Sequence, residues 1–204
     1  MRERPILFSG PMVRAILAGT KTQTRRVAKP VRHPGWKNVY DPGVLAREPK
    51  HTVDLACPYG PPGDRLWVRE SWSSDFANQY PHDHVWYAAD DDRRNDIEVR
   101  DGVRGIYSPE SQQFVRFRWR PSIHMLRSAC RLMLEIAGIR LERLQAISEA
   151  DACAEGIQGQ GLQFYDGRPA TAKDAFESMW SEINGPASWQ ANPWVWVLEF
   201  RRIR

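Results

Sequence analysis

The stretch Lys21-Thr22-Gln23-Thr24-Arg25-Arg26 directly follows a predicted helix that ends at Gly19, and its Thr-rich composition favours an extended strand. Alternate side chains of a strand share a face, so Thr24 and Arg26 are expected on one face and Lys21 on the other, unless the preceding turn rotates it. A nearby lysine can act as general base for a threonine hydroxyl when its pKa falls, and neighbouring arginines favour that fall. The alternative is a basic surface strand.

The residues before this stretch predict a strand followed by a helix. Residues 5–8 are short and apolar, which favours a strand. Ser9-Gly10-Pro11 then begins a helix, because proline is favoured in the first helical turn, and Gly19 ends it. Apolar residues at helical spacing give this helix one apolar face: Met12, Val13, Ile16 and Leu17.

After this stretch, irregular segments separate short elements. Residues 29–62 are rich in Pro and Gly, which predicts a long loop. Residues 71–118 are polar and include an acidic run, which we interpret as a partly mobile insertion. Strands are predicted at 65–70, 131–144 (with a bend at Gly138) and 194–200.

Two helices with capping boxes are predicted in the last third of the chain. Ser148 with Asp151 begins a short helix that stops at Gly156, and Thr171 with Asp174 begins the clearest helix of the chain. The apolar positions of this second helix are Phe176, Met179, Trp180 and Ile183.

Short strands with a few short helices predict an α+β fold, specifically a small mixed β-barrel with flanking helices. A doubly wound sheet would need a regular βαβ alternation, which the chain lacks. We expect a single domain spanning residues 1–204, with insertions at about 29–62 and 71–118. The formal net charge of +4 permits a polyanionic partner without requiring one, and the nine tryptophans suit a core or a stacking surface.

The cysteine pattern argues against both a zinc ribbon and a disulfide framework. Cys57, Cys130 and Cys153 are widely spaced and form no CxxC pair. His82-Asp83-His84 offers two metal ligands without a third, so no metal or other cofactor is expected. The chain shows no signal peptide and no apolar run long enough to span a membrane, so we expect a cytoplasmic protein without a membrane partner.

Other polar residues are candidates for a site. Glu155 lies at a helix end where a carboxylate opposes the macrodipole, which favours pairing with a cation such as Lys21; the alternative is an exposed glutamate. His124 suits substrate contact or a structural hydrogen bond, and Asp64 suits a turn that begins a strand. Three arginines recur along a predicted strand and fit a nucleic-acid groove or a solvated face: Arg131, Arg140 and Arg143.

Four segments of the chain resemble ASCH domains, which have a PUA-like fold. They occur in the family's order, at residues 16–26, 63–68, 147–157 and 196–200. Residues 120–125 are similar to the larger ASCH proteins of phages and prophages. The two long stretches between these segments depart from the compact members of the family.

The resemblance extends to bacterial N4-acetylcytidine amidohydrolases, and it implies a catalytic set. Thr24 would be the nucleophile, Lys21 its base and Glu155 the acidic member, with Arg26 binding or stabilising the substrate. Thr24 would attack the acetyl carbonyl, cytidine would leave, and water would release acetate without a metal. Further residues expected to bind substrate are Arg25, His124 and Asp64.

The expected function is therefore removal of an acyl group from N4-acetylcytidine or a related modified nucleoside or nucleic acid. The alternative is an RNA- or modified-base-binding module, with or without ribonuclease action, which the Arg and Trp content favours. A phage structural or assembly protein is a third alternative, although no repeat or coiled coil supports it. The expected partner is a modified nucleoside or RNA.

Overall fold

The fold was obtained as a computed structural model, and it describes residues 1–75, 85–90, 97–108, 112–157, 164–165, 168–169 and 171–203. The chain divides into two compact units. The first unit comprises Met1–Arg4, Ala15–Leu66 and Met133–Arg204, and the second comprises Pro5–Arg14 and Trp67–Leu132.

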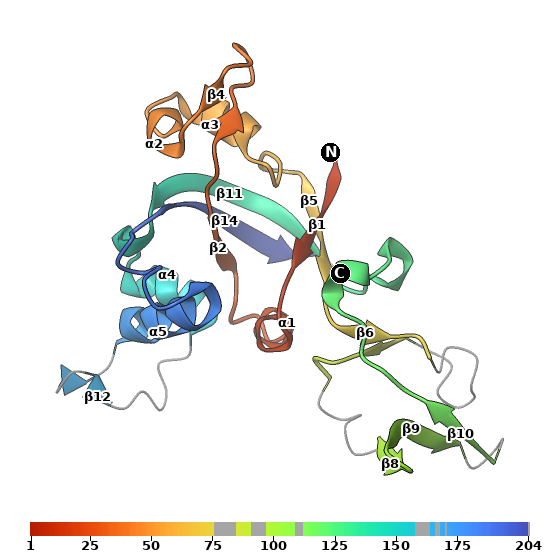
Figure 1. Ribbon diagram of the computed structural model, residues 1–204. Coiled ribbons are helices and arrows are strands. Elements are labelled where there is room, and N and C mark those ends of the chain that lie inside the picture. Colours follow the sequence, from red (N-terminus) through yellow and green to blue (C-terminus); the bar gives the residue numbers. More distant parts are fainter. Residues whose placement is uncertain are drawn as a thin grey trace. The chain divides into compact units, whose positions relative to one another are not determined.

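A mixed five-stranded sheet is the largest element of the fold (Figure 1). Its strands, in spatial order, are β1 (Glu3–Leu7), β5 (Arg65–Arg69), β11 (Met133–Arg143), β14 (Trp194–Arg202) and β2 (Gln23–Val27). β14 is antiparallel to both of its neighbours. Together with short helices, this sheet confirms the expected α+β class.

The N-terminal helix and the bend in the long strand agree with the sequence. α1 spans Gly10–Leu17, and Gly19 follows it with a φ of 75°. In β11 the pairing with β14 shifts register between Ile136 and Gly138, which is a β-bulge. Because a bulge bends its strand, it accounts for the bend expected at Gly138.

Two capped helices build the core of the first unit. α4 (Glu149–Ala154) and α5 (Ala172–Asn184) both begin with the expected capping boxes. They lie side by side next to β14 in Figure 1, and η4 (Leu144–Ala146) precedes α4. Ile183 is 59% exposed, so the buried face of α5 ends at Trp180. The buried cluster comprises Leu144, Ile147, Ala152, Ala172, Phe176, Trp180, Trp189, Val195 and Val197.

Residues 29–62 are more ordered than the predicted loop. They form a hairpin of β3 (Val31–Arg32) and β4 (Val39–Tyr40), then α2 (Pro42–Leu45) and α3 (Lys50–Ala56). These elements are too short for a hydrophobic period to show in the sequence, so the prediction of a loop was wrong here. Before α5, β12 (Phe164–Tyr165) pairs antiparallel with β13 (Arg168–Pro169).

The second unit contains short strands around a small aromatic core. Its elements are β6 (Trp72–Ser73), β7 (Trp86–Tyr87), β8 (Glu98–Arg100), β9 (Val103–Ser108), β10 (Gln113–Arg116), η2 (Ser122–His124) and η3 (Arg127–Ala129). Trp86, Ile106 and Phe117 form the buried cluster. The stretch His82-Asp83-His84 and most of the acidic run lie outside the described residues.

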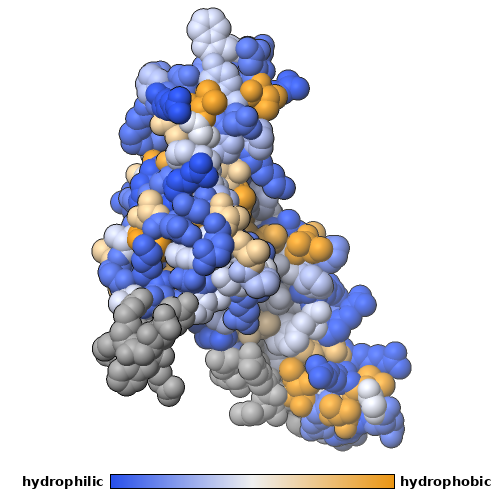
Figure 2. Space-filling model, turned by 60° about the vertical axis from the view of Figure 1, so that its left-hand side comes forward, coloured by the Kyte–Doolittle hydropathy of each residue, from blue (hydrophilic) through white to orange (hydrophobic). Residues whose placement is uncertain are grey.

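Hydrophilic side chains cover most of the face drawn in Figure 2, with hydrophobic ones scattered among them. Scattered exposed hydrophobic residues are normal for a folded surface. Among the described helices, none is both long and apolar enough to cross a membrane.

Candidate functional site in the first unit

A buried ion pair joins Lys21 to Glu155. Lys21 Nζ donates one hydrogen bond to Glu155 Oε2 and another to the Glu155 backbone oxygen, each at 2.8 Å. The exposed fractions of the two side chains are 0% and 3%. The backbones also meet, since Lys21 and Glu155 form an antiparallel bridge and Thr22 N–H donates to the oxygen of Ala154 at 2.8 Å. The predicted pairing is therefore present in the structure.

The end of α4 places Glu155 beside Lys21. Glu155 is the C-cap of the helix, and Gly156 follows with a φ of 91°, a conformation that favours glycine. A Cβ at Gly156 would lie 3.1 Å from the Cβ atoms of both Ala15 and Lys21. Glycine is thus required here for the turn and for the close approach of the lysine segment.

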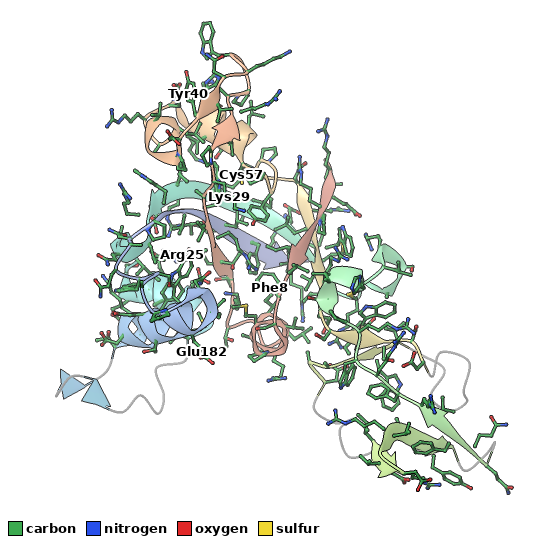
Figure 3. All side chains as sticks on the ribbon, in the orientation of Figure 1. Phe8, Arg25, Lys29, Tyr40, Cys57 and Glu182 are labelled. Atoms are coloured by element: carbon green, nitrogen blue, oxygen red, sulfur yellow. The ribbon has the colours of Figure 1, made fainter. Side chains whose placement is uncertain are left out.

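Arg25 lies on the same side of the site and contacts three carboxylates. It donates to Glu155 Oε1 at 3.2 Å and to Glu142 Oε1 at 2.7 Å, and it pairs with Asp151 Oδ2 at 3.2 Å. Its guanidinium also lies 5.8 Å from the centre of the Phe176 ring. In Figure 3 it lies between β2 and the helices α4 and α5. These contacts tie β2 to α4, and substrate binding by Arg25 stays a prediction.

Arg140 contacts two of the three carboxylates that also contact Arg25. It donates to Glu142 Oε2 at 2.9 Å and to Asp151 Oδ1 at 2.7 Å, and it also pairs with Glu199. Glu142 and Asp151 therefore each bridge Arg25 and Arg140. Sequence reasoning missed this network, although the Arg140–Glu142 spacing on one strand was a usable signal.

Burial and charge set the protonation of the site. Burial lowers the pKa of Lys21, and the charges of Arg26 and Arg25 add to that effect, while Glu155 opposes it through its charge and hydrogen bond. Burial alone would raise the pKa of Asp151, but the hydrogen bond and charge of Arg140 bring it down to about 2. The amine thus loses its proton more readily than an exposed lysine does.

Thr24 lies on β2 between the arginines and is buried, with 2% of its surface exposed. Its backbone pairs with Leu198 of β14. The Lys21 amine donates two hydrogen bonds to Glu155, and the contact of Lys21 with the Thr24 hydroxyl that the resemblance implies stays a prediction. Nucleophile–base contacts are often loose before substrate binds.

Arg26 is expected on the same face of β2 as Thr24, since strand side chains alternate. Burial lowers the pKa of Arg26, while the nearby groups of Tyr59 and Glu155 raise it. Burial has the opposite effect on the phenol of Tyr59, whose pKa it raises, and the charge of Arg26 opposes that rise. Tyr59 was not among the predicted site residues, because its place in a Pro- and Gly-rich turn gave no sign of a partner on β2.

The two remaining predicted residues lie elsewhere. Asp64 accepts hydrogen bonds from the Arg2 N–H at 2.8 Å and from Arg4 Nη1 at 2.6 Å, so it ties the N-terminal segment to the start of β5. His124 belongs to η2 of the second unit and is exposed.

No group of three or more His, Cys, Asp or Glu residues suited to a metal ion occurs within the described ranges. All three cysteines are free. Comparison with protein-family models, curated proteins and solved structures found no match to this chain.

Proposed function

We propose that this chain is an ASCH-type protein with a PUA-like fold, and that it hydrolyses the amide of N4-acetylcytidine or a related acylated nucleoside. The observation that carries the proposal is the buried Lys21–Glu155 pair, which lies three residues along the chain from the buried side chain of Thr24. The pairing of β2 with β14 joins segments near opposite ends of the chain, as in a sheet that curls into a small barrel.

Lys21 is suited to act as the general base. A base must be partly unprotonated at working pH, and burial together with two arginines lowers the pKa of this amine. Glu155 holds the amine through two acceptors, so its orientation is fixed before substrate arrives. The arginine–carboxylate network holds Glu155 in turn through Arg25.

The reaction follows from these roles. Thr24 Oγ1 attacks the acetyl carbonyl carbon and passes its proton to Lys21 Nζ, and a tetrahedral oxyanion forms. The C–N bond then breaks, the ammonium of Lys21 returns the proton to the departing N4 amine, and the acetyl group stays on Thr24 as an ester. Water, deprotonated by Lys21, attacks that ester and releases acetate and the free threonine. Arg26 is the candidate donor to the oxyanion.

The test is incubation with N4-acetylcytidine, with cytidine and acetate followed by chromatography. Thr24→Val keeps the shape of the buried side chain and removes the hydroxyl, so it should abolish release, whereas Thr24→Ser should retain part of it. Thr22→Ala is the matched control, because Thr22 is exposed and lies two residues away. No release at high enzyme concentration, or full activity in Thr24→Val, would overturn the proposal.

A second readout tests the covalent step. Rapid acid quenching of the unmodified enzyme during turnover should trap the acetyl ester, and mass spectrometry of the digested protein should locate it on Thr24. An acetyl group found on another residue would contradict the assigned nucleophile.

A further inference from the structure

The second unit carries a cleft of about 670 Å³ that is lined by aromatic and basic side chains. Its lining residues are Trp72, Arg118, Trp119, Arg120, Pro121, His124 and Leu126. The cleft lies wholly within this unit, and none of its residues except His124 was assigned a role from the sequence.

One wall of the cleft is held rigidly by Arg120. Trp72 and Arg120 exchange backbone hydrogen bonds of 3.2 and 2.8 Å, and the Arg120 guanidinium lies 5.2 Å from the centre of the Trp72 ring. Asp75 pairs with Arg120 at 2.6 Å, and Ser74 accepts from it at 3.0 Å. Arg120 is therefore neutralised and serves as part of the scaffold.

Trp119 is half-buried, and its indole is fixed by the core of the unit. Its ring packs edge-on against Phe117, with 4.7 Å between the ring centres and an interplanar angle of 83°. Phe117 in turn contacts Trp86 at 6.0 Å. An aromatic ring held by its neighbour in this way keeps its orientation when a flat ligand stacks on it.

The surface beside the cleft is basic. Arg118 also lines a neighbouring cleft of about 540 Å³, together with Arg104, Arg116 and Asp75, the carboxylate that pairs with Arg120. These three arginines are exposed, and none has an ion-pair partner among the residues that the structure describes. Residues 112–132 contain five arginines and no Asp or Glu. Arg25 and Arg140 of the first unit, by contrast, are paired with carboxylates.

Exposed guanidinium groups next to a fixed aromatic ring match the chemistry of a single nucleic-acid strand. Arginine contacts phosphate through two parallel hydrogen bonds, and an unpaired base offers a flat face for stacking. A duplex keeps its bases inside the helix, so it would use the arginines without the ring.

We propose that the second unit binds single-stranded nucleic acid, with phosphates at Arg104, Arg116 and Arg118 and a base against Trp119. The binding site is independent of the hydrolysis proposed for the first unit. Its occupant is a polynucleotide strand rather than a free nucleoside, because the arginines extend over two adjacent clefts.

The experiment measures binding of the full chain to fluorescent oligonucleotides by anisotropy. The probes are single-stranded RNA and DNA of one sequence, the corresponding duplexes, and heparin as a polyanion without bases. Either single strand should bind more tightly than its duplex, and affinity should fall as salt rises. The two single strands, compared at one salt concentration, show which sugar is preferred.

Variants separate the phosphate and base contacts. The triple variant Arg104→Gln/Arg116→Gln/Arg118→Gln should lower affinity at least ~10-fold and reduce the salt slope by roughly one unit per arginine. Arg32→Gln removes one exposed charge from the first unit and should leave binding unchanged. Trp119→Ala should weaken single-strand binding about tenfold with little effect on heparin, and Trp119→Phe should restore it.

Several results would overturn the proposal. An affinity that does not depend on salt would do so, as would a loss of affinity in Arg32→Gln equal to that in the triple variant. Tighter binding of the duplex than of the single strand would also contradict it. So would an equal affinity for heparin and the single strands, if Trp119→Ala has no effect on strand binding. Each variant is checked for the unfolding transition of the unmodified protein. Trp119→Phe, which keeps an aromatic ring at this position, is the second variant in case Trp119→Ala misfolds.

Discussion

Lys21 Nζ donates to both the carboxylate and the backbone oxygen of Glu155, 134 residues further along the chain, at 2.8 Å each. The carboxylate oxygen supplies the opposite charge for the lysine amine, and the backbone oxygen fixes the direction in which that amine points. Since both side chains are almost completely buried, neither can replace its partner with water. The pair therefore matters to folding as well as to the proposed chemistry.

Lys21→Met should destabilise the protein by about 3 kcal/mol, because it removes the lysine partner of the buried Glu155 carboxylate and leaves it with Arg25. The free energy of unfolding from urea titration measures this effect. Thr22→Ala, an exposed change in the same segment, should stay close to the starting value.

The double variant Lys21→Met/Glu155→Leu shows how much of that loss is an unpaired charge. Replacing both members with apolar side chains removes the uncompensated carboxylate, so the double variant should be more stable than the sum of the single losses predicts. Strict additivity would mean that the two residues do not interact energetically.

Asp151→Asn should reduce the loss of stability in acid. The folded-state pKa of Asp151 is about 2, below its ordinary value of 3.8, so the carboxylate stabilises the fold above pH 3.8 and loses that effect as pH falls through 2. Between pH 5 and pH 2 the unmodified protein should lose on the order of 1–2 kcal/mol more than the variant. Urea titrations at several pH values measure this, and parallel curves for the two proteins would contradict it.

The sequence predicted the elements with strong local signals. The capping residues Ser148 and Thr171 begin helices as expected, and the alternation of polar and apolar residues located β5 and β11. The short helices α2 and α3 were not predicted, because one or two helical turns are too short to show a hydrophobic periodicity. Ile183 was assigned to the apolar face of α5, but the helix extends beyond the core at that residue.

The candidate site was predictable in its residue types and only partly in its contacts. The unfavourable position of Glu155 at a helix end correctly pointed to a cation, and Lys21 is that cation. The bridging of Arg25 and Arg140 by Glu142 depends on the register of β2 beside β14 and β11, which no local pattern encodes.

Only one of the three thiols should react quickly with a disulfide reagent. Cys153 is exposed on α4, whereas Cys57 and Cys130 are buried. Burial raises the pKa of the Cys57 thiol to about 12, which leaves almost no thiolate at pH 8. The coloured thiolate that the reagent releases should appear in one fast phase, equal to one thiol per chain. Cys153→Ser should remove this phase, and the other two thiols should react only on unfolding. Two fast equivalents in the native protein would contradict the buried positions.

The pH dependence of the proposed hydrolysis should report on Lys21. A base acts when it is unprotonated, so kcat/KM for N4-acetylcytidine should rise with pH and reach a plateau. The midpoint of the rise should lie at the pKa of Lys21, which is lower than the ordinary lysine value of 10.5. Glu155 raises that pKa, so Glu155→Gln should move the midpoint to lower pH in whatever fraction remains folded. Thr22→Ala should keep the original midpoint, and uncatalysed hydrolysis is subtracted at each pH. A midpoint that moves upward in Glu155→Gln, or one that does not move, would mean that the rate follows a group other than Lys21.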